Sequence, residues 1–93
     1  MNPAAPIPRS ELEQALRTAL EPTRLEVLDE SAAHAGHAGA NAQGSGTHFR
    51  IRIASPVFDG RSRVQQHRLV YDCLQHLMDR GLHAMAIEIL PNP

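Results

Sequence analysis

The sequence predicts a small α+β domain with its elements in the order helix, strand, strand, helix, strand. Three patterns lead to this expectation. Apolar residues recur at helical spacing over residues 11–20, apolar and polar residues alternate over 48–53, and a second helical stripe after residue 62 leads into an apolar run at 84–90. A chain of 93 residues has room for one such domain with a thin core.

The first helix is expected over residues 11–20. Ser10 and Glu13 have the spacing of a capping box, and Pro22 cannot continue the helix. Residues 1–9 are rich in proline and alanine, which favours a flexible N-terminal segment. A short strand is then expected over about residues 25–29.

Residues 31–46 predict a long mobile loop, because they include no large apolar side chain. Gly36 and Gly39 match the GXXG spacing of KH domains. In KH domains that loop joins two helices, whereas here it follows a strand, so we attribute the match to chance.

The middle strand is the clearest local pattern. Its three apolar residues face one way, and His48, Arg50 and Arg52 face the other. A turn follows over residues 55–60, with room for a short helical turn. The second helix is expected to begin near Ser62 and to have Gly81 as its C′ residue, and the last strand is expected over 84–90.

Composition narrows the classes of function. The chain has no tryptophan and only three aromatic rings among Phe and Tyr, which disfavours a stacking platform for single-stranded nucleic acid. No apolar run approaches the length of a membrane span, and the first residues lack the pattern of a secretory signal, so we expect a cytoplasmic protein without membrane contact. The single cysteine, Cys73, lies on an apolar helical stripe and is expected to be structural.

Charge is unevenly distributed along the chain. The net charge is −1, but residues 8–30 carry three Arg and six acidic residues, whereas residues 46–80 carry six Arg and three Asp. The central segment therefore offers a candidate nucleic-acid surface, consisting of Arg50, Arg52, Arg63 and Arg68. An ordinary solvated sheet face and helix start would have the same composition.

Six histidines are the most unusual feature of the composition. His34 and His37 lie in the predicted loop, and His83 lies where the second helix gives way to the last strand. Imidazole is a common metal ligand, but no spacing here matches a complete zinc or metalloprotease motif. Incidental loop histidines and a capping role for His83 are the alternatives. No nucleophile, base and orienting group can be assembled, so an enzyme is disfavoured.

Five segments in the same order resemble the BolA family: residues 25–31, 47–49, 58–60, 67–71 and 83–86. The resemblance extends over about residues 10–90, so we expect one domain over 10–91. The chain has Gln66-His67-Arg68 where the family usually has Arg-His-Arg, which puts in doubt any contact that needs the first arginine.

The resemblance implies a fold similar to the class II KH arrangement, a three-stranded sheet with both helices on one face. It also implies a partner, a monothiol (CGFS-type) glutaredoxin, and a [2Fe–2S] cluster that the two proteins share. The glutaredoxin and bound glutathione would supply thiolates, and this chain would supply His83 and His34, with His37 in reserve.

Alone, the chain is expected to hold no cofactor and to be a monomer or a weak homodimer. The leading hypothesis is a non-enzymatic adaptor in iron–sulfur cluster assembly, trafficking or iron sensing. The alternative is a DNA-binding transcriptional regulator that uses the Arg-bearing central segment.

Overall fold

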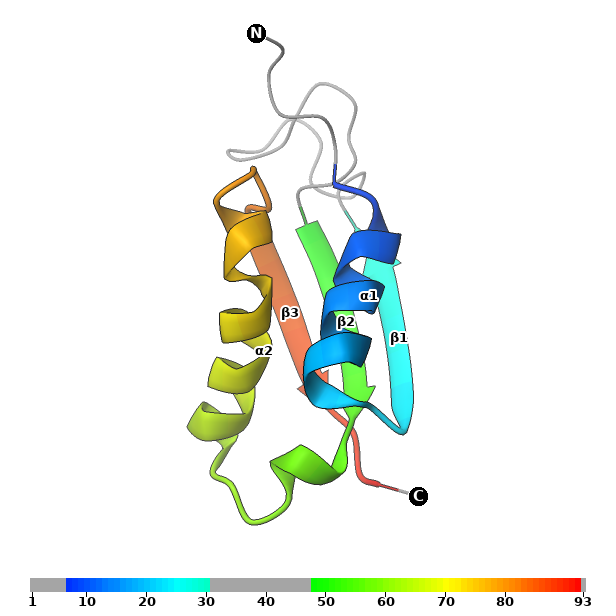
Figure 1. Ribbon diagram of the computed structural model, residues 1–93, viewed down its shortest axis with the longest axis vertical. Coiled ribbons are helices and arrows are strands. Elements are labelled where there is room, and N and C mark those ends of the chain that lie inside the picture. Colours follow the sequence, from blue (N-terminus) through cyan, green and yellow to red (C-terminus); the bar gives the residue numbers. More distant parts are fainter. Residues whose placement is uncertain (1–6, 31–47, 93) are drawn as a thin grey trace, which may run out of the picture.

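In the computed structural model, residues 7–30 and 48–92 are described, and they form two helices packed on one face of a three-stranded sheet (Figure 1). The elements are α1 (Arg9–Leu20), β1 (Arg24–Asp29), β2 (His48–Ala54), the 3-10 helix η2 (Pro56–Phe58), α2 (Arg63–Met78) and β3 (Ala84–Ile89). This order confirms the predicted α+β class and the short helical turn before α2. The predicted loop over 31–46 lies outside the described residues.

The sheet has the strand order β1-β2-β3, with β1 antiparallel to β2 and β2 parallel to β3. Asp29 lies opposite Phe49, and His48 lies opposite Ala84. The end of β1 and the starts of β2 and β3 therefore meet at one end of the sheet. The C-terminal end of α2 lies at the same end of the molecule (Figure 1).

The alternation along β2 places its apolar residues under the helices as predicted. Phe49, Ile51 and Ile53 are buried and pack against the apolar stripes of α1 and α2. The helices contribute Leu12, Leu16 and Leu20 from α1 and Val70, Leu74 and Leu77 from α2. Burial of these side chains is the main stabilising contribution in a domain of this size.

The start of α1 differs from the expectation. The helix begins at Arg9 after an extended Pro8, no side chain caps it, and the Glu11 N–H donates to the Pro8 carbonyl at 3.0 Å. The predicted capping box at Ser10 is therefore wrong, because Ser10 already lies within the first turn. Ile7 is only 2% exposed and belongs to the core. Burying this side chain fixes the chain just before the helix, so the last residues of the segment expected to be flexible are part of the fold.

Both ends of α2 have specific caps. The Ser62 hydroxyl accepts the Gln65 N–H, and the Gln65 side chain accepts the Ser62 N–H, which makes a complete capping box. At the other end Gly81 has φ 122°, and the Leu82 N–H donates to the Leu77 carbonyl at 3.0 Å. This arrangement fits the predicted role of Gly81 as the C′ residue.

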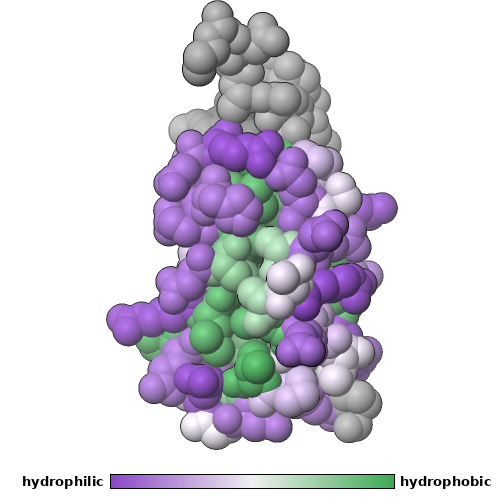
Figure 2. Space-filling model, viewed as in Figure 1, coloured by the Kyte–Doolittle hydropathy of each residue, from purple (hydrophilic) through white to green (hydrophobic). Residues whose placement is uncertain are grey.

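The two faces of the domain differ in character. On the helical face, apolar residues form a strip between the two helices that hydrophilic residues frame (Figure 2). Ala15, Ala19 and Cys73 line the hollow there. The opposite face of the sheet has no helix on it among the described residues. None of the described helices is long and apolar enough to span a bilayer.

Candidate functional site

His83 is exposed at the end of the sheet where β3 begins. It follows buried Leu82, which anchors the turn after α2, and it precedes Ala84, the first residue of β3. The rings of His83 and His48 have centroids 5.2 Å apart with planes tilted by 56°. Two imidazoles from residues far apart in the sequence therefore lie side by side.

His48 is the residue at this site that the sequence analysis did not assign. It begins β2 and was expected on the polar face with Arg50 and Arg52, yet it is only 8% exposed. Alternation along the strand gives its face, but not the parallel register that sets it opposite Ala84. That register is a tertiary property, and it is what brings His48 to His83.

The backbone at this end of the sheet also fixes where residues 31–47 join the fold. The Glu30 N–H donates to the His48 carbonyl at 2.8 Å, so the residues that flank this segment are hydrogen-bonded neighbours. Since His48 touches His83, the chain re-enters the fold beside His83, and it leaves the fold at Glu30 on the other side of β2. The candidate ligands His34 and His37 belong to this segment and lie outside the described residues.

The described side chains at the end of the sheet near His83 do not make up a complete set of metal ligands. Within residues 7–30 and 48–92, no three His, Cys, Asp or Glu side chains come together in a way that could hold a metal ion. At this end the described residues offer one exposed imidazole, His83, beside the nearly buried ring of His48. This pair does not make a self-contained structural zinc site, which needs four protein ligands.

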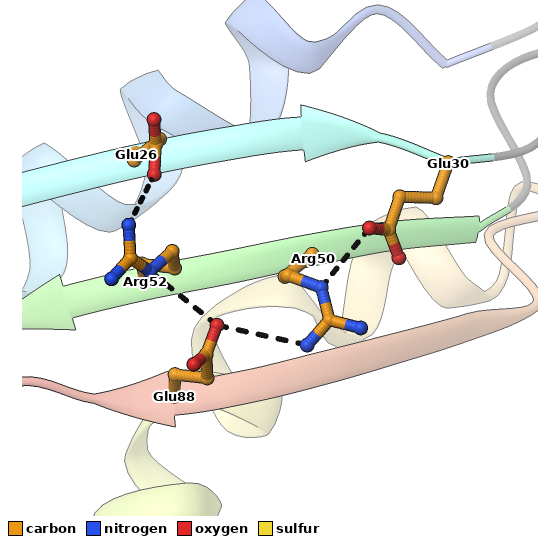
Figure 3. A network of polar contacts seen from close by, with 5 residues as sticks. All are labelled: Glu26, Glu30, Arg50, Arg52 and Glu88. Atoms are coloured by element: carbon orange, nitrogen blue, oxygen red, sulfur yellow. Dashed lines mark hydrogen bonds and ion pairs between the residues drawn. The ribbon is translucent and has the colours of Figure 1, made fainter.

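The uncovered face of the sheet carries a cross-strand network of charges (Figure 3). Arg50 Nε lies 3.0 Å from Glu30 Oε2, and Arg52 Nη1 lies 2.9 Å from Glu26 Oε1. Glu88 Oε2 lies between the two guanidinium groups, 3.6 Å from Arg50 Nη1 and 3.4 Å from Arg52 Nε. The hydrogen bond from Arg50 to Glu30 raises the pKa of the Arg50 guanidinium. Three carboxylates against two guanidinium groups give this network a formal charge of −1.

The other two candidate arginines, Arg63 and Arg68, lie on α2, which packs on the opposite face of the sheet. Both are exposed, and neither has an ion-pair partner among the described residues. The structure therefore does not gather the four arginines on one surface. It places two in a neutralising network and two on the helical layer.

Cys73 is a half-buried thiol. Its Sγ donates to the Val70 carbonyl at 3.2 Å, and burial raises the pKa of the thiol to about 11. A thiol that stays protonated at neutral pH is a poor nucleophile and a poor metal ligand. These properties agree with the structural role predicted for Cys73.

Comparison with known proteins decides the family. The sequence profile of the family described as BolA-like protein matches residues 16–92. The chain belongs to the BolA family. It is 46% identical over 79 residues to SufE-like protein 1, chloroplastic/mitochondrial, of Arabidopsis thaliana, and the match covers 82% of this chain but only 21% of that protein.

Other BolA relatives match over most of their length. The chain is 35% identical over 79 residues to the DNA-binding transcriptional regulator BolA of Escherichia coli, a match that covers 85% of this chain and 70% of that protein. The solved structure of BolA1 from Arabidopsis thaliana superposes with a TM-score of 0.77 at 40% identity, covering 92% of this chain and 93% of the other. The predicted three-stranded sheet with both helices on one face is therefore confirmed, and its mixed strand pairing belongs to the BolA fold.

Proposed function

We propose that this BolA protein is a non-enzymatic adaptor in iron–sulfur cluster assembly, trafficking or iron sensing. In this proposal it shares a [2Fe–2S] cluster with a monothiol glutaredoxin. His83 supplies one ligand, and His34 supplies the second, with His37 in reserve. The observation that carries the proposal is the position of exposed His83 against His48, the residue at which the chain re-enters the fold after residues 31–47 and to which Glu30 is hydrogen-bonded.

Chain length supports a ligand from this segment. His34 is four residues beyond Glu30, so its backbone can reach at most about 14 Å from that anchor. Glu30 is hydrogen-bonded to His48, which contacts His83. The chain between Glu30 and His34 is therefore long enough for the His34 side chain to reach the His83 imidazole.

The kinds of metal ligand that this chain offers also support a cluster shared with a second protein. A [2Fe–2S] cluster needs four terminal ligands, and this chain offers imidazoles, since its only thiol is half-buried with a raised pKa. Thiolates must then come from outside, which a glutaredoxin and glutathione can provide. Two imidazoles in place of two thiolates raise the reduction potential of such a cluster.

The test is a reconstitution of this chain with a monothiol glutaredoxin, iron, sulfide and glutathione. We expect a visible absorption and circular-dichroism spectrum that differs from that of the glutaredoxin homodimer and that His83→Ala abolishes. His34→Ala should destabilise the mixed species, and His37→Ala should leave it largely intact. His67→Ala, a histidine on α2 away from this end of the sheet, is the matched control.

An unchanged homodimer spectrum with the wild-type chain would remove the proposal. Loss of the mixed spectrum in His67→Ala as well would show that the variants act through folding rather than through ligation. Far-ultraviolet circular dichroism of each variant alone separates the two cases.

A second function, DNA-binding transcriptional regulation, has one specific observation in its favour. Exposed Arg63 and Arg68 on α2 are free to contact phosphates, and the Escherichia coli relative is described as a DNA-binding regulator. Arg50 and Arg52 contribute less, because three glutamates surround them. A steep fall of affinity with salt, together with a sequence preference at moderate salt, would support this function. Binding without sequence preference would reduce it to weak non-specific attraction.

A further inference from the structure

The rings of His48 and His83 lie at a separation that suits two ligands of a single metal ion. Their centroids are 5.2 Å apart. Zn²⁺ lies about 2.0–2.1 Å from a ligating imidazole nitrogen, and so about 3.2 Å from the centre of that ring. Two imidazoles that bind one ion at the tetrahedral angle of about 109° therefore have centres about 5.2 Å apart. At the right angle of square-planar Cu²⁺ or Ni²⁺ the same length gives only about 4.5 Å, so the observed separation favours a tetrahedral ion.

The backbone holds both histidines in place at the same end of the sheet. His48 is the first residue of β2, and its carbonyl accepts the Glu30 N–H at 2.8 Å. His83 lies between buried Leu82 and Ala84, the residue opposite His48 in the parallel register. Ligands on the ends of strands need little further ordering when an ion binds, which favours affinity.

The tilt and the exposure of the two rings also suit a shared ion. Their planes are inclined by 56°, so the rings are not stacked face to face, an arrangement in which their in-plane lone pairs could not meet at one point. A metal-bound imidazole uses one ring nitrogen and commonly turns the other toward the protein, so a ring that is only 8% exposed, like His48, can still be a ligand. His83 is exposed, which gives an ion from solvent access to the pair.

Water is expected to fill the other coordination positions of such an ion. In the part of the chain that the structure describes, no group of three His, Cys, Asp or Glu side chains could hold a metal ion. A four-coordinate Zn²⁺ on this pair therefore keeps two positions for water. Arg50 and Arg80, the arginines nearest to the pair along the chain, each lie against a carboxylate, which limits their repulsion of a cation.

We propose that His48 and His83 bind one Zn²⁺ ion in the chain without a partner, with water in the remaining positions. Two protein ligands make an exchangeable site, weaker than a structural site with four. Zinc binding by the chain alone departs from the expectation that it holds no cofactor on its own. Because His83 is also a ligand in the proposed function, the ion and the shared cluster exclude each other. That consequence rests on the proposed function, whereas zinc binding itself does not.

The test is a titration of the full chain with Zn²⁺ in the absence of glutaredoxin, iron, sulfide and glutathione. Competition with a zinc-sensitive fluorescent indicator measures the affinity and the number of ions per chain. The nitrogen-15 chemical shifts of the imidazoles identify the ligands. We expect one ion per chain, and one ring nitrogen each of His48 and His83 should shift in proportion to the bound fraction. The ring nitrogens of His67 and His76, both on α2, should not shift.

Substitutions of the histidines supply the matched variants. His83→Ala and His48→Phe should each weaken Zn²⁺ binding by at least about 10-fold, because even residues one shell away from a metal commonly change its affinity by that factor. His76→Ala, beside Cys73 in the hollow between the helices, should leave the affinity unchanged. The double substitution of His34 and His37 with alanine should also leave it unchanged, since the pair needs neither. Far-ultraviolet circular dichroism of each variant checks that it is folded.

Three results would overturn the proposal. Equal affinity in the wild type, His83→Ala and His48→Phe, or no binding at all, would mean that the two rings form a packing contact only. Loss of binding in His76→Ala would assign the ion to His76 and Cys73. Loss of binding in the double variant of His34 and His37 would show that His48 and His83 do not suffice. None of these results depends on whether the chain forms a mixed cluster, because glutaredoxin is absent, so failure of the proposed function is measured separately.

Discussion

The imidazole rings of His48 and His83 contact each other across β2 and β3, with centroids 5.2 Å apart. His48 is nearly buried and His83 is exposed, so the His83 ring packs against a ring that is held within the fold. A group that orients a metal ligand without binding the metal commonly changes affinity by about 10–100-fold when it is removed. For the proposed cluster site, we therefore expect His48 to act as a positioning residue for His83.

This assignment predicts different outcomes for two substitutions of His48. His48→Phe keeps a ring against His83 and should retain the mixed-cluster spectrum with glutaredoxin. His48→Ala removes the support and should make the cluster about 10-fold more sensitive to a chelator. The measurement is the decay of visible absorption after adding the chelator. If His48→Phe forms no mixed cluster although the variant is folded, His48 is itself a ligand.

The burial of Ile7, just before α1, predicts how its substitution changes the stability of the fold. Ile7→Ala removes a side chain that is 2% exposed and should lower the free energy of unfolding by about 2–4 kcal/mol. Urea unfolding followed by circular dichroism measures the change. Val64→Ala, at a residue that is 61% exposed, should change it by less than about 0.5 kcal/mol. Equal midpoints for Ile7→Ala and the wild type would mean that the segment before α1 adds nothing to the fold.

The order of the elements could be predicted because each follows from a local pattern. Alternation over 48–53 and apolar stripes in both helices depend only on neighbours in sequence. The start of α1 was missed because burial of Ile7 is a tertiary contact, and it overrides the cap that Ser10 suggests.

The candidate site shows the same division between local and tertiary information. His83 could be proposed from its motif, but its contact with His48 spans 35 positions in the sequence and depends on strand register. The basic face expected around Arg50 and Arg52 is likewise changed by register. It places Glu26 and Glu88 opposite Arg52, on neighbouring strands.

The charge network on the uncovered sheet face predicts how DNA binding would respond to neutralisation. Replacing Glu30 and Glu88 with glutamine leaves Arg50 and Arg52 with one carboxylate partner, Glu26, and changes the formal charge of the network from −1 to +1. Non-specific affinity for duplex DNA at low salt should rise several-fold. The slope of log affinity against log salt should steepen by about 1–2, because each new phosphate contact adds about 0.9.

Fluorescence anisotropy with a labelled duplex measures both quantities. The matched control replaces Glu13 and Glu21 on and after α1, which changes net charge equally but on the helical layer. An equal rise in affinity for the control would show that overall charge decides binding and that the sheet face has no special part in it.

The raised pKa of Cys73 predicts the reactivity of the thiol and its dependence on pH. With a pKa of about 11, the thiolate is scarce at pH 8, and iodoacetamide should modify the folded chain on the order of 100-fold more slowly than an ordinary free thiol. The raised pKa of Cys73 also makes the free energy of unfolding depend on pH. The folded state holds the proton more tightly than the unfolded state, so this contribution is fully present below about pH 9 and is lost as the pH rises through about 11. Alkylation rates measured by mass spectrometry from pH 7 to 11, with the urea-unfolded chain as the control, test the expected slow modification of Cys73. Fast alkylation of the folded chain at pH 8 would mean that Cys73 is exposed and activated, and a reactive thiol would then have to be considered for this protein.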